Sequence, residues 1–193
     1  MIFLTDFFDQ AVVLPVVAAV AAVLALLGWW RGAIGWLLAV GVTFGAVLIL
    51  KLGFLACGPV FGPWSLRSPS GHTAAAAMVA GGLAALAAGR RSAAVPVAVL
   101  AAGMIGATRV ALGFHSVAEV CLGGAIGVAG AALLPGLAGR RRARRPVALL
   151  LAACVVAVVL HGLRLPAEAA IWHASQGGLD FVPACRGERG GPV

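Results

Sequence analysis

Long runs of apolar residues dominate this chain and limit what it can fold into. A helix that crosses a lipid bilayer needs about 20 predominantly apolar residues. Segments close to that length cover residues of about 11–29, 33–56, 72–88, 93–111, 117–137 and 146–160. With 62% hydrophobic and only 10% charged residues, the composition lies outside the range of soluble domains. The sequence therefore predicts an all-α integral membrane protein, a helical bundle of about six transmembrane helices.

The arginines predict how these helices are oriented. Arg31, the pair at 90–91 and the arginine-rich run at 140–145 follow the first, third and fifth apolar segments. Because basic residues concentrate in cytoplasmic loops, both termini and the connections 57–71 and 112–116 are expected outside. The net charge of +8 is interpreted as this orientation signal, with contacts to anionic membrane lipids, and no nucleic-acid partner is expected.

The chain is interpreted as one transmembrane domain, residues 1–160, followed by an extracytoplasmic tail, residues 161–193. Within the tail, residues 167–175 are expected to form a short amphipathic helix at the outer surface. The first ten residues are interpreted as an interfacial lead-in without visible chemistry. The expected location is a bacterial inner membrane, with the outer helix ends facing the periplasm or exterior.

Ionisable side chains interrupt the apolar pattern near the outer ends of the second to fifth segments. They are Lys51, Arg67, His72, Arg109, His115 and Glu119. Ionisable groups at membrane depth are costly, so they mark a functional site by default. Each alone has a structural explanation, since the cations can extend to the interface and Glu119 can pair with an arginine. Gathered on one face, they predict a shared site.

This combination of groups suits the handling of a phosphate ester. Arginine and lysine neutralise phosphate oxygens, and a helix that begins at residues 70–72 offers backbone N–H groups to an anion. If the fifth apolar helix begins near Phe114, His115 and Glu119 lie on one face of it. The carboxylate can then hold the imidazole in one tautomer. One histidine could attack phosphorus while the other protonates the leaving oxygen. No spacing resembles a zinc site, so neither a metal nor another cofactor is expected.

Three short motifs resemble the signature of the type-2 phosphatidic acid phosphatase superfamily. That signature is written KxxxxxxRP, PSGH and SRxxxxxHxxxD. The corresponding segments are KLGFLACGP (51–59), PSGH (69–72) and TRVALGFHSVAE (108–119). Their order, internal spacing and position at outer helix ends agree with the family, and the resemblance covers about residues 45–130.

The resemblance implies a role for each matching residue. His115 would be the nucleophile that forms a phosphohistidine, and His72 would be the general acid. Glu119 would be the carboxylate that supports His115. The groups implied to hold the phosphoryl oxygens are Lys51, Arg109, the Ser70 hydroxyl and the Gly71 backbone N–H.

The chain departs from the family pattern at three positions. Thr108 replaces serine and keeps the hydroxyl, while Glu119 replaces aspartate and keeps the charge. Gly58 replaces an arginine, and the loss of such a charge-assisted donor weakens transition-state stabilisation. Arg67, close to the second motif, is a candidate replacement, although it could equally face solvent or headgroups.

The resemblance implies an enzyme, a membrane phosphatase that hydrolyses a lipid phosphate monoester or pyrophosphate at the outer interface. Isoprenoid (pyro)phosphates, phosphatidylglycerophosphate or phosphatidic acid, and lipid A phosphates all fit this location. The alternatives are a lipid phosphotransferase and a non-catalytic protein that binds or transports a lipid phosphate. The sequence does not choose among these substrates or predict an oligomeric state.

The four cysteines show no zinc-site or CxxC spacing. Cys121 and Cys154 lie in predicted spans and are expected to pack as small apolar residues. Cys57 and Cys185 are both expected on the outer side, where disulfides persist. A bridge between these two and a pair of free thiols are both compatible with the sequence.

Overall fold

The computed structural model shows an all-α protein, as predicted. It describes residues 2–57, 68–139, 143, 145–167, 169–171 and 173. The helices are α1 (Ile2–Asp6), α2 (Gln10–Leu26), α3 (Trp30–Cys57), α4 (Gly71–Ala88), α5 (Arg91–Ala111), α6 (Val117–Ala138) and α7 (Pro146–Val159). The described part of the chain contains no strand.

The helices differ in length, and this affects the predicted number of spans. Helices α3, α4, α5 and α6 are long and apolar enough to cross a membrane. Helices α2 and α7 are apolar but have only 17 and 14 residues, which corresponds to about 26 and 21 Å against a hydrocarbon core of roughly 30 Å. All six predicted segments are therefore helical, but a count of six transmembrane spans is not confirmed.

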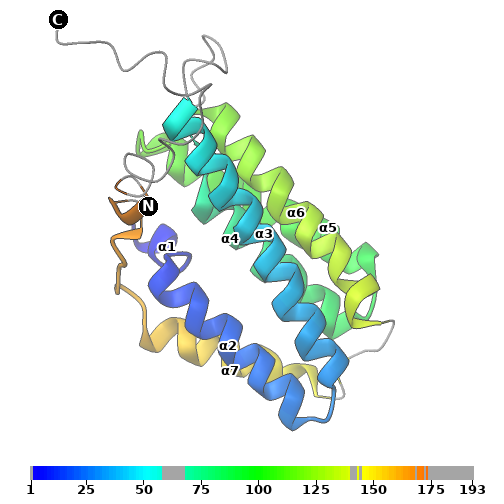
Figure 1. Ribbon diagram of the computed structural model, residues 1–193. Helices are drawn as coiled ribbons and strands as arrows, with labels where there is room; N and C mark the ends of the chain where they lie inside the picture. Colours follow the sequence, from blue (N-terminus) through cyan, green and yellow to red (C-terminus); the bar gives the residue numbers. More distant parts are fainter. Residues whose placement is uncertain are drawn as a thin grey trace, which may run out of the picture.

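Helix α4 lies at the centre of a bundle with α3, α5 and α6, whereas α2 and α7 run side by side along one flank (Figure 1). Small residues make this central position possible. The side chains of residues 74–77, all alanine, are fully buried. A β-carbon added at Gly127 of α6 would collide with the carbonyl oxygen of Ala74, so the two backbones touch. Such close approach is typical of helices that pack in lipid.

Helix α2 is attached to α3 by a buried polar contact. The indole N–H of Trp36, a fully buried side chain, donates a hydrogen bond of 3.0 Å to the carbonyl oxygen of Val17. A donor buried at membrane depth needs such a partner, because no water is available there. The contact helps to fix α2 against α3, and the start of α2 then lies beside the end of the bundle where α4 begins.

Cys121 and Cys154 lie within α6 and α7, as predicted, and both are exposed at the surface of the bundle. The buried residues of α6 include glycines such as Gly123 and Gly127, whereas Cys121 is not among them. The side chain of Cys57, and Cys185 altogether, lie outside the described residues.

Candidate active site

The three motifs meet at one end of the bundle. Lys51 lies near the end of α3, residues 69–72 lead into α4, and residues 108–119 connect α5 to α6. In Figure 1 the end of α3, the start of α4 and the connection from α5 to α6 lie at the same end. The up-and-down order of the helices therefore brings segments together that are far apart in the sequence.

The turn that begins α4 is built to receive an anion. Ser70 is the N-cap of α4, and its Oγ accepts hydrogen bonds from the backbone N–H of Thr73 at 3.4 Å and from the Thr73 hydroxyl at 2.9 Å. A β-carbon added at Gly71 would lie 3.8 Å from Cε of Lys51, so the lysine side chain passes over this turn. Lys51 is only 2% exposed. A buried cation thus lies beside the positive end of a helix, where a phosphate is favoured.

The carboxylate of Glu119 links the second and third motifs. Its Oε2 atom lies 3.0 Å from Nδ1 of His115 and accepts a 2.9 Å hydrogen bond from the backbone N–H of Ser116. Its Oε1 atom accepts a 2.9 Å hydrogen bond from the backbone N–H of Ser68, and its backbone carbonyl accepts one from the N–H of Ser70. Because a carboxylate only accepts, Nδ1 of His115 carries the hydrogen. In the neutral ring, Nε2 then has a free lone pair.

The predicted geometry of the histidine and its acid was wrong in one respect. Helix α6 begins at Val117, as the apolar segment 117–137 predicted, and not near Phe114, so His115 precedes the helix. The two side chains meet because Ser116 and Glu119 form a capping box, in which the Glu119 side chain turns back to the N-cap residue. The four letters SVAE contain that capping signal, so the sequence could have indicated it.

Burial lowers the pKa of His115 below its ordinary value of 6.5, and this is the largest influence on the ring. The hydrogen bond and the charge of Glu119 act in the opposite direction and raise it, while the positive charges of Lys51 and Arg109 lower it further. The imidazole is therefore neutral at neutral pH, as a nucleophile must be.

Arg109 is held from two sides. Its Nη1 atom donates a 3.2 Å hydrogen bond to the hydroxyl of Thr5 in α1, and its guanidinium lies 4.5 Å from the centre of the Phe114 ring. Stacking on an aromatic ring stabilises a guanidinium. The arginine is thus fixed in part by a residue near the start of the chain, far from the three motifs.

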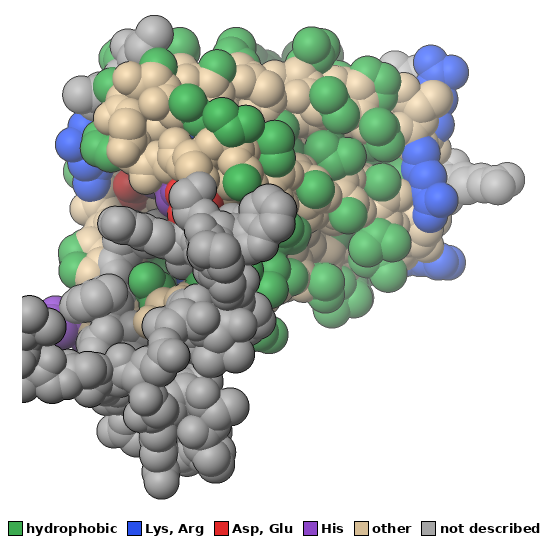
Figure 2. All heavy atoms as spheres, turned by 90° about the horizontal axis from the view of Figure 1, so that it is seen from above, with side chains coloured by type: hydrophobic (Ala, Val, Ile, Leu, Met, Phe, Trp, Pro, Cys, Tyr) green, Lys and Arg blue, Asp and Glu red, His purple; other side chains and the backbone are tan. Residues whose placement is uncertain are grey.

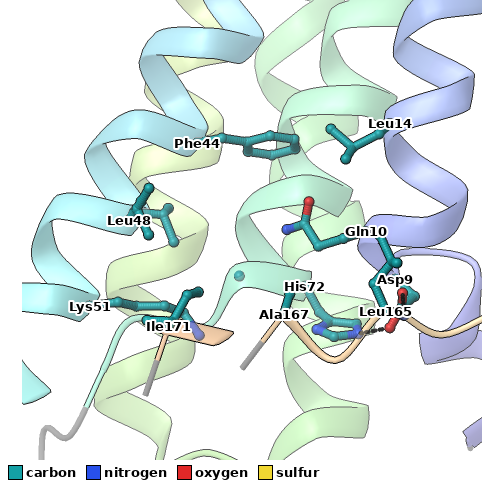
Figure 3. A pocket seen from close by; sticks show the side chains of 12 residues that line it. Asp9, Gln10, Leu14, Phe44, Leu48, Lys51, His72, Leu165, Ala167 and Ile171 are labelled. Atoms are coloured by element: carbon teal, nitrogen blue, oxygen red, sulfur yellow. Dashed lines mark hydrogen bonds and ion pairs between the residues drawn. The ribbon is translucent and has the colours of Figure 1, made fainter. Parts of the chain in front are cut away.

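His72 faces a pocket of about 290 Å³ between α2, α3, α4 and the segment that follows α7 (Figure 3). One end of the pocket is apolar and contains Leu14 and Phe44. The other end contains the polar side chains of Asp9, Lys51 and His72, with Leu165, Ala167 and Ile171 of the segment after α7 beside them. Nε2 of His72 lies 3.8 Å from Oδ2 of Asp9. The pocket therefore has the polarity of an amphipathic ligand.

Sequence reasoning missed Thr5, Asp9 and Ser68. The first ten residues were interpreted as a lead-in without visible chemistry, but they contribute contacts to the candidate site, because Thr5 contacts Arg109 and Asp9 faces His72. One signal was available. Asp6 and Asp9 are two of only six acidic residues in the chain, and their end of the chain was already expected on the side of the site.

Two positions from the sequence analysis cannot be placed. Gly58 and its candidate replacement, Arg67, both lie outside the described residues. Thr108 is described, and its hydroxyl donates a 2.7 Å hydrogen bond to the carbonyl of Ile105 within α5. Among the described residues, no group of three or more His, Cys, Asp or Glu side chains could hold a metal ion.

The arrangement defines a class of protein: a membrane-type helical bundle with two histidines, two cations and a carboxylate gathered at one end. Residues 51–143 match the family model of the PAP2 superfamily, and this part of the chain belongs to that superfamily. The match agrees with the resemblance carried by the three motifs, and it supports a phosphatase-type activity. Comparisons with curated proteins and with solved structures gave no match.

Proposed function

We propose that the protein is a membrane lipid phosphatase that hydrolyses a phosphate monoester or pyrophosphate carried by a lipid. The observation that favours a lipid is the two-ended pocket of about 290 Å³. Its polar end contains Lys51 and His72, and its apolar end, lined by Leu14 and Phe44, extends between α2 and α3 (Figure 3). A phosphate at the polar end would leave a hydrocarbon tail in apolar surroundings.

In this proposal the reaction proceeds in two steps. Nε2 of His115 attacks phosphorus, a P–N bond forms, and the P–O bond to the leaving group breaks. Protonated His72 gives its proton to the leaving oxygen. Water then attacks the phosphohistidine, passes a proton to His72, and releases phosphate with His115 restored. Throughout both steps, the charge on the phosphoryl oxygens is neutralised by Lys51 and Arg109. The same oxygens accept hydrogen bonds from the N–H of Gly71 and the hydroxyl of Ser70.

The location of the site follows from the arginine distribution. If the arginine-rich end of the bundle is cytoplasmic, the site faces the periplasm or exterior at the outer leaflet of a bacterial inner membrane. Labelling of single introduced cysteines from outside, in a variant without native cysteines, tests this. Position 164 near the site should react, whereas position 90 should not. Labelling of position 90 alone would place the site on the cytoplasmic side.

The decisive experiment is phosphate release by the purified protein. The panel contains phosphatidic acid, phosphatidylglycerophosphate, an isoprenoid pyrophosphate, a lipid A phosphate and glycerol 3-phosphate, which has no tail. The lipid phosphates should be hydrolysed far faster than glycerol 3-phosphate, and His115→Ala and His72→Ala should each abolish release. Full activity in either variant would remove the mechanism. Phosphate transfer to an added alcohol without release would indicate the phosphotransferase, and binding without turnover the non-catalytic alternative.

A matched pair of variants tests the position of the tail. Leu48 lines the pocket, whereas the next residue, Ile49, is 70% exposed on the outside of α3. Leu48→Trp should raise KM for a lipid phosphate without affecting glycerol 3-phosphate, because the indole occupies part of the pocket. Ile49→Trp should change neither. Equal effects of the two variants would mean that the tail does not enter this pocket.

A further inference from the structure

A second polar pocket, of about 750 Å³, lies at the end of the bundle opposite the candidate active site. It is formed by the start of α3, the connection from α4 to α5 and the end of α6. Its lining consists of Arg31, Gly89, Arg90, Arg91, Ser92, Pro135, Gly136 and Gly139. Figure 2 shows a row of Lys and Arg side chains at one end of the molecule, beyond the band of hydrophobic side chains, and a smaller group at the opposite end. The proposed reaction uses none of these residues.

Two of the arginines lie over the end of α6, where glycines leave room for them. Nε of Arg31 donates a 3.2 Å hydrogen bond to the carbonyl oxygen of Leu137. A β-carbon added at Gly139 would lie 3.6 Å from Cζ of Arg31, and one added at Gly136 would lie 3.7 Å from an Nη atom of Arg91. The guanidinium groups therefore approach the same helix end from two different elements, and the pocket lies between these elements.

The charge in this pocket is not balanced by the described part of the chain. The described carboxylates belong to Asp6, Asp9 and Glu119, and all three lie at the other end of the bundle, in or beside the candidate active site. Within the described residues, Arg31, Arg90 and Arg91 form no ion pair, and Arg31 bonds only to a backbone carbonyl. Three cations around one pocket repel one another unless an anion lies between them.

The start of α5 adds hydrogen-bond donors to the same pocket. Arg90 is its N-cap residue and makes no side-chain capping bond. Backbone N–H groups in the first turn of a helix have no partner within that helix. Ser92, in that first turn, contributes a hydroxyl to the lining. Guanidinium groups, a hydroxyl and backbone N–H groups are the donors with which proteins bind phosphate oxygens.

We propose that this pocket binds the phosphate group of an anion, with the headgroup of an anionic membrane lipid as the expected source. Basic pockets between transmembrane helices bind such headgroups, and this pocket lies between the ends of α3, α5 and α6, which are long and apolar enough to cross a membrane. The proposal is independent of the phosphatase activity. It goes beyond an orientation signal, which requires positive charge in a loop but no pocket and no convergence of guanidinium groups.

Native mass spectrometry of the purified protein in detergent tests the proposal. The probe is short-chain phosphatidylglycerol, whose phosphate is a diester and therefore not a substrate of the proposed reaction. Zwitterionic phosphatidylcholine of the same chain length is the control lipid. Arg90→Gln/Arg91→Gln removes two pocket arginines, whereas Arg145→Gln removes an exposed arginine at the same end that does not line the pocket. Thermal unfolding without lipid tests whether each variant is folded. If the double glutamine variant is not folded, Arg90→Lys/Arg91→Lys replaces it, because this variant keeps the positive charges.

Phosphatidylglycerol should bind the parent protein more tightly than phosphatidylcholine. Its affinity should fall about 30-fold in the double glutamine variant, less in the double lysine variant, and little in Arg145→Gln. If millimolar inorganic phosphate displaces phosphatidylglycerol, the pocket is a phosphate site whose ligand is free phosphate. If phosphatidylglycerol stays bound, the ligand is the lipid headgroup. Equal affinity in the parent and the double glutamine variant, or an equal loss in Arg145→Gln, would overturn the proposal.

Discussion

Glu119→Gln is the most informative single change, because it keeps the size of the side chain and removes only its charge and part of its accepting capacity. Both carboxylate oxygens face hydrogen-bond donors: Oε1 faces Ser68, and Oε2 faces Ser116 and His115. An amide has one accepting oxygen and one donating nitrogen. Whichever way the amide turns, its NH₂ group meets at least one N–H donor.

The size of the effect depends on which contact is lost. If the amide oxygen stays near His115, the N–H of Ser68 loses a charge-assisted hydrogen bond worth about 1.5–3 kcal/mol. If the amide is reversed, its NH₂ favours the tautomer of His115 in which Nε2 carries the hydrogen and cannot attack. In both cases the charge that stabilises the imidazolium-like ring is lost. We expect turnover to fall by about 100- to 10 000-fold.

The assay is steady-state phosphate release at saturating lipid phosphate, with His115→Ala as the floor and far-UV circular dichroism as the test of folding. Glu119→Asp, the residue usual in the family, is the matched control. It keeps the charge but is shorter by one methylene, so it should lose the contact to Ser68 before the contact to His115 and fall less than Glu119→Gln. Turnover of Glu119→Gln within about twofold of the parent would refute this account of the site.

Three further outcomes are expected. Because burial lowers the pKa of His115, the fall of kcat/KM on the acid side of the pH profile, where the nucleophile becomes protonated, should have its midpoint below about pH 6.5. An acid-side midpoint above that pH would contradict the assignment. A β-carbon at Gly123 would collide with the carbonyl oxygen of Ser70, so Gly123→Ala should lower the unfolding free energy by about 1–3 kcal/mol and reduce activity. A β-carbon added at Gly103 would have no atom within 4 Å, so Gly103→Ala should change neither the unfolding free energy, measured by denaturant unfolding, nor the activity. Asp9→Asn retains a capping side chain for α2 but removes the carboxylate that faces His72, so turnover should drop about three- to tenfold, and unchanged turnover would exclude a role for that contact.

The sequence predicted the helical class and the convergence of the motifs because both follow from strong, local signals. A run of apolar residues specifies a helix in lipid, and alternating helices bring the ends of neighbouring segments together. The contacts of Thr5 and Asp9 were not predictable in this way, because they join α1 and α2 to helices about 60 or 100 residues distant in the sequence. They depend on how α2 packs against α3, which residues such as Trp36 decide.

The way in which His115 and Glu119 of the third motif meet was also not predictable from their spacing alone. An interval of four residues suggested one face of a helix for His115 and Glu119, whereas the structure uses the capping box of α6. The contact to Ser68 depends on the approach of α4 to α6 at Gly123. This close approach depends on tertiary packing. The many small residues of α4 and α6 allow several alignments of the two helices, so the sequence does not specify which residues touch.

The unequal helix lengths described above have a consequence for the surrounding bilayer. Helix α3 has 28 residues, whereas α2 and α7, which pack together on one flank, have 17 and 14. If α2 and α7 also cross the membrane, no single membrane thickness matches all three helices. The long α3 must then tilt, or the lipid beside α2 and α7 must thin, at a cost of a fraction of a kcal/mol per ångström. Because Asp9 caps α2 and residues of α2 line the pocket, such a hydrophobic mismatch would fall on the flank of the site. Acyl-chain length of the host membrane is therefore expected to act on this protein as a physical variable, separate from the identity of its substrate.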